Sequence, residues 1–218
     1  MTHTKRRGMT LADAALEFWR HPTPWLLVTA LGAAVAARLA VGDWQWSDAV
    51  LPFVVLAVFP FVEWMIHVLI LHWRPRRIAG VMIDPVLARK HREHHADPRI
   101  TRLIFIPLQS LVGAFVAALV VAFVLIPRTG LGLTFLVTLF VIGVVYEWSH
   151  YLVHTDYKPK TWFYRTIYRN HRLHHFKNEH YWFAVTTPGL ADRALGTYPD
   201  PKTVPTSPTA KNLYASAG

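Results

Sequence analysis

The sequence predicts an all-α integral membrane protein with four transmembrane helices in two hairpins and a helical cap that holds a histidine-rich dimetal site. Two observations predict this fold class. Apolar residues make up 53% of the 218 residues, and they are gathered in long runs instead of being spread at amphipathic spacing. Ten histidines fall in four clusters beside those runs. The absence of cysteine excludes disulfides, zinc fingers and thiolate nucleophiles.

Each transmembrane helix is predicted from the length of an apolar run. About 20 helical residues are needed to cross the roughly 30 Å hydrocarbon core of a bilayer. Short connections after the first and third runs predict two tight hairpins, because they leave room only for a turn. The four runs are Trp25 to Val41, Ala49 to Leu71, Leu103 to Ile126 and Leu131 to Val153, and the two connections are Gly42 to Asp48 and Pro127 to Gly130.

These runs also define the expected organisation of the chain. Residues 1–24 are predicted to form a cytoplasmic N-terminal segment, and residues 25–197 a single membrane domain. Residues 198–218 are rich in Pro, Thr, Ser and Ala, which predicts a flexible C-terminal tail.

The distribution of Lys and Arg predicts the orientation. If both termini and the loop after Leu71 share one side, that side holds all 23 basic residues except Arg38 and Arg128. The positive-inside rule places it in the cytoplasm, and we expect a multi-pass protein of a bacterial inner membrane. The same side receives every clustered histidine, which predicts a cytoplasmic helical cap. Because the basic residues flank spans, anionic lipid headgroups are the expected partners, and nucleic acid is not.

The histidine clusters predict a site for two metal ions. Imidazole suits iron, zinc, copper and nickel, and four or five such ligands fill most of a coordination sphere. Surface roles, nucleic-acid contacts or pH sensing do not explain why the clusters recur at the ends of elements. The predicted ligands are His67 and His72, His91, His94 and His95, His150 and His154, and His171, His174 and His175.

Helical geometry explains most of the spacing. Residues three or four apart share a helix face, whereas adjacent histidines diverge by about 100°, so that His94 and His95 can serve different ions, as can His174 and His175. The five-residue step from His67 to His72 requires a frayed end, a wide turn or a local bulge. We expect ordinary roles for His3 and His21, and the role of His180 stays open.

Two parts of the sequence echo each other. Glu63-Trp64 precedes the first histidine cluster and Glu147-Trp148 the third, and the pattern Arg-x-His-Arg-x-His-His recurs 80 residues after its first occurrence. Duplication and convergence both remain open. Each glutamate lies one helical turn before a histidine, where it could accept that histidine's second ring N–H or pair with an arginine at the interface.

The histidine pattern, over about Phe61 to Thr197, resembles the membrane-bound fatty acid hydroxylase and sterol desaturase superfamily. The greatest likeness is to fatty acid 2-hydroxylases, through three further features: Glu63 before the first cluster, the stretch Leu103-Ile104-Phe105-Ile106-Pro107, and His174-His175-Phe176-Lys177-Asn178 leading to Phe183-Ala184-Val185-Thr186-Thr187-Pro188 and later Asp192. The haem-carrying electron-donor domain of eukaryotic members does not occur in this sequence, so the resemblance implies a separate reductase or ferredoxin-like donor.

The resemblance implies a non-haem di-iron oxygenase that hydroxylates an acyl chain of a fatty acid or lipid with O2 and external electrons. It implies two Fe ions, with no catalytic residue beyond the metal ligands and no other cofactor. In isolated protein, zinc is an alternative to iron at the two predicted metal sites. Two other functions remain open: a sterol, hopanoid or carotenoid hydroxylase or desaturase of the same superfamily, and a histidine-rich metal carrier.

Overall fold

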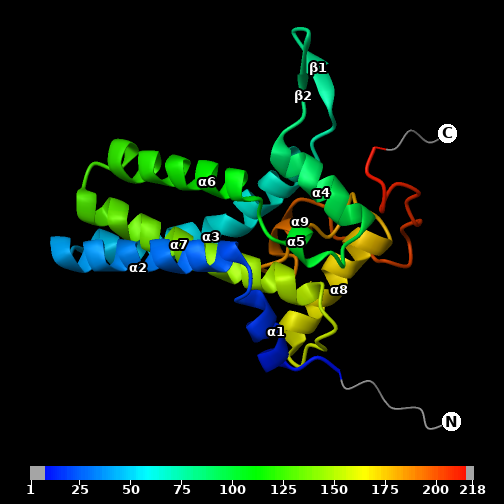
Figure 1. Cartoon of the computed structure of the whole chain (residues 1–218), viewed down its shortest axis with the longest axis horizontal. Coiled ribbons are helices and arrows are strands. Elements are labelled where there is room, and N and C mark those ends of the chain that lie inside the picture. The colour runs from blue at the N-terminus through cyan, green and yellow to red at the C-terminus, as the bar shows by residue number, and fades with distance from the viewer. Residues whose placement is uncertain (1–7, 215–218) are drawn as a thin grey trace.

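The computed structural model describes residues 8–214. In that part of the chain, long helices lie side by side at one end of the molecule and shorter elements gather as a cap at the other (Figure 1). The elements, in chain order, are α1 Leu11–Phe18, α2 Pro22–Val41, α3 Trp46–Ile66, the π-helix η1 His67–Leu71, β1 Arg76–Ile78, β2 Val81–Ile83, α4 Val86–Ala96, α5 Thr101–Ile104, α6 Leu108–Val120, the π-helix η2 Val121–Leu125, α7 Thr129–Val153, α8 Trp162–Phe176 and α9 Leu190–Ala194.

Within residues 8–214, four helical segments are long and apolar enough to cross a bilayer. They are α2, α3 with η1, α5 through η2, and α7, and they match the four predicted runs to within a few residues. The third run is not continuous, however. The helix stops at Ile104 and restarts at Leu108, because Pro107 has no N–H to donate and disfavours helical geometry at the residue before it.

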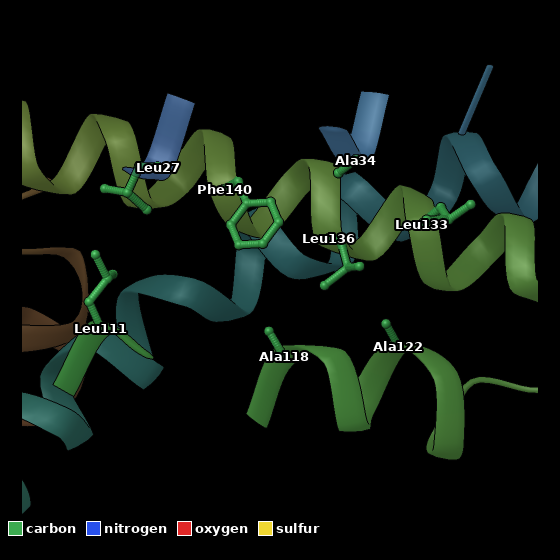
Figure 2. Close-up of a cluster of buried hydrophobic side chains, with 8 residues drawn as sticks. All are labelled: Leu27, Ala34, Leu111, Ala118, Ala122, Leu133, Leu136 and Phe140. Carbon is green, nitrogen blue, oxygen red and sulfur yellow. The ribbon is translucent and has the colours of Figure 1, made fainter. Parts of the chain in front are cut away.

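Helix α7 is the centre of the membrane bundle. It packs along α2 and α3 and, on another side, against η2. Figure 2 shows Ala118 of α6 pointing toward Phe140 and Leu136 of α7, and Leu111 of α6 pointing toward Leu27 of α2. Near the end of the bundle away from the cap, a Cβ at Gly132 would clash with the backbone carbonyl of Ala122. Glycine at this position therefore permits the close approach of η2 and α7.

A buried ion-pair network closes the end of the bundle away from the cap. The Arg38 side chain, only 3% exposed, lies with one guanidinium nitrogen 3.2 Å from Asp48 Oδ2, and its Nε donates to Thr134 Oγ1 at 2.9 Å. Arg128 reaches the same Asp48 oxygen at 2.7 Å. Arg38 and Arg128, the two basic residues outside the predicted cytoplasmic side, therefore share the Asp48 carboxylate.

Replacing Asp48 with alanine should destabilise the fold by about 3 kcal/mol, since it removes the one buried carboxylate beside Arg38 and leaves that buried charge only the more exposed Asp43 at 3.3 Å. Thermal unfolding in detergent micelles measures the effect. The matched control is Glu17→Ala, which breaks the exposed Arg20–Glu17 pair and should cost less than about 1 kcal/mol. Equal shifts for the two variants would contradict a structural role for the network.

The prediction of an all-α fold is wrong in one place. Strands β1 and β2 form an antiparallel hairpin, with Arg76 opposite Ile83 and Ile78 opposite Val81. Its two-residue turn has positive φ at both positions, 48° at Ala79 and 82° at Gly80, as in the turns that favour tight hairpins. Each strand has only three residues, which is too short for the alternation of apolar and polar side chains to be recognised in the sequence.

The C-terminal segment also differs from the expectation of a flexible tail. The predicted tail, as far as Tyr214, packs on the cap, with Val204, Ala210 and Leu213 buried. Polar contacts anchor it, because the Tyr214 hydroxyl donates to the carbonyl of His72. The rest of the predicted tail, 215–218, and residues 1–7 of the predicted N-terminal segment lie outside the described residues, as does His3.

Candidate metal centre

The ten predicted ligand histidines lie in two groups of five. Within each group, one nitrogen of every ring lies within 4.8 Å of the others. We call them group A, which is His67, His72, His91, His95 and His174, and group B, which is His94, His150, His154, His171 and His175. The groups adjoin, since the rings of His95 and His175 stack with centroids 4.1 Å apart.

Helical spacing sorts the histidines between the groups. Pairs four residues apart share a group, as His91 and His95 do on α4 and His171 and His175 do on α8. Members three apart do not, because His94 joins group B although His91 is in group A. Adjacent histidines are separated, as expected from their roughly 100° divergence on a helix.

The five-residue step from His67 to His72 is bridged by the π-helix η1. The N–H of His72 donates to the carbonyl of His67 at 3.0 Å, which is the i to i+5 bond of this helix type. Both imidazoles thereby enter group A, with ring centroids 5.1 Å apart. Of the frayed end, wide turn or local bulge that this step was expected to require, the structure has the bulge.

Ring nitrogens in each group face one another at ligand separations. Nε2 of His154 lies 3.0 Å from that of His94 and 2.9 Å from that of His171. In group A, Nε2 of His95 lies 3.1 Å from that of His91. Two nitrogens bound at about 2.1 Å and at a right angle on one ion would be about 3.0 Å apart, so the donors have the spacing of ligands around a common centre.

Two group A rings have tautomers that leave a lone pair facing inward. His95 Nδ1 donates to the Ala210 carbonyl, and His174 Nδ1 donates to the Tyr181 carbonyl, each at 2.8 Å. Because a carbonyl only accepts, both Nε2 atoms carry no proton, yet they lie 3.2 Å apart. Two facing lone pairs repel in the absence of a cation, and this donor set therefore fits a metal ion.

The electrostatics of the cap keep the donors neutral. Burial lowers the pKa of the His95 imidazole to about 4. Burial, with the neighbouring rings adding to it, also holds the pKa values of His94, His171 and His175 well below the ordinary value. Neutral imidazole is the form that binds metal, so the cap favours the ligating state.

Neither interpretation offered for the paired glutamates is correct. Glu63 accepts from the N–H groups of Val185 and Thr186 at 2.8 and 3.1 Å, and from the Thr186 hydroxyl. Glu147 accepts from the N–H of Ile106 at 2.9 Å, the donor freed where the third span breaks. Both carboxylates thus hold backbone near the centre and bind neither a histidine nor an arginine among the described residues.

The segment 183–186, whose backbone N–H groups at Val185 and Thr186 donate to Glu63, covers group A. Phe183 packs its ring against His67, His72 and His174, with centroids 5.2 to 5.6 Å apart. Asp192 of α9 accepts from the N–H of Phe183 at 2.9 Å and is fully buried, with a pKa raised by that burial. This role of Asp192 was not predicted; the signal in the sequence is an acidic residue that follows a largely apolar segment, which indicates a hydrogen-bonded carboxylate if the segment is buried.

Replacing Asp192 with alanine should weaken metal binding about 10-fold, because it frees the segment that orients group A. Competition with a chelator, followed by elemental analysis, measures the affinity. Asp200→Ala is the control, since Asp200 is exposed and bonds only within its own turn to Lys202 and Thr203. An unchanged affinity in the Asp192 variant would show that the segment does not support the ligands.

Two other histidines lie outside both groups. His180 is exposed, with its ring 3.6 Å from Glu179, and His21 stacks on Phe105 at 4.2 Å between centroids. His21 thus has the ordinary role expected of it, and His180 takes no part in the grouping.

Comparison with known proteins decides the family. A family model described as fatty acid hydroxylase matches residues 52–197, most of the chain. The chain belongs to the fatty acid hydroxylase family. A solved structure, described as full-length scs7p with only the hydroxylase domain visible, has a similar fold, with a TM-score of 0.64 and 20% identity over 92% of this chain and 70% of that chain. No curated protein matches the sequence.

The family assignment confirms the resemblance and makes this an integral membrane hydroxylase with a histidine-rich metal site. The matched region ends at Thr197, where the resemblance ended, and begins nine residues before Phe61, within the second span. All ten grouped histidines lie inside it.

An apolar cavity of about 240 Å³ lies between the spans of this hydroxylase. Leu27 of α2, Phe59 of α3, Leu111 of α6 and Phe140 of α7 are among its walls, and Ala118 lines it too. A smaller cavity of about 30 Å³ adjoins it toward the cap. The two cavities share the lining residues Leu71, Leu87, Ile106 and Tyr146.

The smaller cavity reaches the metal centre. Its walls include His91 of group A and His150 of group B, together with Lys90. A continuous set of side chains therefore leads from the interior of the membrane bundle to one histidine of each group.

Proposed function

We propose that this hydroxylase uses two iron ions and O2 to hydroxylate an acyl chain of a fatty acid or lipid. The ten histidines would hold the ions, five around each, and no other side chain is proposed as a catalytic residue. The observation that carries the proposal is the apolar cavity between the spans, since it leads to His91 and His150, one from each group.

Two iron ions held in this way would supply the reduction of O2 and the oxidation of an unactivated C–H bond. The reaction balances when one C–H group, one O2, two electrons and two protons give one alcohol and one water. Zinc has no redox cycle, so zinc in an isolated sample would report only that the sites bind metal.

The chain's own residues bind and orient the substrate. Leu111, Phe115 and Phe140 offer the alkyl chain an apolar wall and exclude water from it. Lys90 lines the smaller cavity, and its ammonium group, which is paired with Glu93 at 2.7 Å, could exchange that partner for a carboxylate or phosphate head. The walls belong to membrane spans, so the acyl chain can enter from the bilayer.

Two further features belong to the proposal. The positive-inside distribution supports a cytoplasmic location for both termini and for the histidine groups, with residues 25–197 as the membrane domain. Since the reaction consumes two electrons per hydroxyl, it requires an external donor, a separate reductase or ferredoxin-like protein.

Lipid mass spectrometry of membranes from expressing cells tests the proposal. Cells grown with iron and O2 are compared with cells that express a His95→Ala, His175→Ala double variant at the same level. An acyl lipid that gains one oxygen only with the parent chain supports acyl hydroxylation, and fragmentation locates the carbon. Oxygenated sterols, hopanoids or carotenoids instead would overturn the acyl substrate, and unaltered lipids beside a supplied electron donor would overturn the reaction.

A further inference from the structure

The β1–β2 hairpin stands apart from the rest of the described structure. It projects sideways from the helical body, across the direction of the long spans (Figure 1). All three residues of β1 and two of the three in β2 are exposed. A two-stranded hairpin without a packed face is marginally stable in water, so contacts at its exposed tip would add to its stability.

The exposed side chains at its tip are large and apolar. Ile78 is 47% exposed, Val81 61% and Met82 55%. Ile78 and Val81 are opposite each other on one face, and Met82 lies opposite Arg77 on the other, so apolar groups occur on both faces. The tip can therefore be surrounded by an apolar medium, whereas it is poorly suited to docking through one flat face.

Basic and aromatic groups surround this apolar tip. Between Trp73 and Ile83 the chain carries Arg74, Arg76 and Arg77 and has no acidic residue. The Arg76 guanidinium stacks over the Trp73 ring at 4.0 Å, and the indole N–H of Trp73 donates to the Ile83 carbonyl at 3.1 Å. Arginine and tryptophan around an apolar group are typical of the lipid headgroup region.

The position of the hairpin fits the same environment. Strand β1 begins five residues after Leu71, the end of the second span, so it cannot lie far from the membrane surface. Its base is tied to α4, because Arg92 donates to both carboxylate oxygens of Asp84 at 2.7 Å and to the Trp73 carbonyl at 3.2 Å. Helix α4 carries three of the grouped histidines and three residues that line the smaller cavity, Leu87, Lys90 and His91.

We propose that the hairpin is a lipid anchor, with its apolar tip inserted in the headgroup region of the leaflet at the histidine end and its arginines on anionic phospholipid phosphates. The anchor fixes the height of α4, and with it the smaller cavity, relative to the bilayer. This inference requires a membrane protein but does not depend on which substrate is hydroxylated.

The native chain has no cysteine, so a single introduced cysteine can be labelled specifically. A nitroxide at Val81→Cys is compared with one at Thr206→Cys, an exposed position in the segment after α9, in nanodiscs that contain phosphatidylcholine and phosphatidylglycerol. Power-saturation EPR then measures collisions with O2, which concentrates in lipid, and with a water-soluble nickel complex. The metal content of each labelled protein confirms that the cap is intact.

The anchor predicts a ratio of O2 to nickel collisions several-fold higher at position 81 than at 206. Equal ratios would overturn it, and so would a label shielded from both reagents, since protein would then cover the tip. The headgroup contact predicts that the ratio at 81 falls in nanodiscs of phosphatidylcholine alone and in an Arg76→Gln, Arg77→Gln variant. If the ratio at position 81 is the same in phosphatidylcholine alone and in the Arg76→Gln, Arg77→Gln variant, the role of anionic lipid is overturned.

Discussion

Replacing either His95 or His175 with alanine is expected to lower lipid hydroxylation by more than about 100-fold while leaving a membrane-inserted protein. His95 belongs to group A and His175 to group B, so each variant removes one proposed ligand from a different ion. Loss of an outer hydrogen-bond partner already costs up to about 100-fold at metal sites, and a direct ligand should cost more. Hydroxylated lipid per amount of membrane protein, measured by mass spectrometry, gives the effect.

The matched control is His180→Ala. His180 lies four residues after the end of α8, the helix that carries His175. It is exposed and lies outside both groups, so its variant should retain parent activity. Metal analysis of the purified proteins separates ligand loss from misfolding, because each ligand variant should keep the ion of the other group. Full activity in either ligand variant would contradict the assignment of its group.

Filling the cavity is expected to give the second large effect. Ala118→Phe places an aromatic ring in the space between α6 and α7 that the acyl chain is proposed to occupy (Figure 2). Because a single methylene in an apolar pocket changes specificity by about 10-fold or more, hydroxylation of long chains should fall by at least that factor. Competition between acyl lipids of different chain length, read by mass spectrometry, measures the change.

The neighbouring position provides a matched control on the same helix. Ala117 is exposed and does not line the cavity, so Ala117→Phe adds the same ring on the outer face of α6 and should leave activity unchanged. Equal losses in both variants would indicate a general effect on the helix. Parent activity in the Ala118 variant would exclude this cavity as the acyl site.

Much of the metal centre follows from local geometry, which is why the sequence could predict it. The separation of His94 from His95 depends only on the rotation per residue of a helix, and the bulge between His67 and His72 on the need to bring a five-residue step to one face. The family resemblance was likewise carried by these spacings. The spacing of the histidines does not determine which metal binds, because imidazole binds several metals.

The parts that could not be predicted depend on contacts between distant segments. Glu63 binds the backbone of residues 185 and 186, more than 120 positions away, and no spacing rule indicates that partner. Similarly, composition suggested a loose tail, yet the Ala210 carbonyl in that tail accepts from His95. A few apolar side chains, here Val204 and Leu213, suffice to pack a polar segment.

The central claim is that this chain inserts oxygen from O2 into an acyl chain at a two-ion histidine site. The most direct test is a reaction of the purified, iron-loaded protein in nanodiscs with 18O2, a reductant and a defined acyl lipid. We expect a hydroxylated lipid whose new oxygen is 18O, formed only when iron occupies both histidine groups. A hydroxyl that carries oxygen from water, or equal product from metal-free protein, would contradict it.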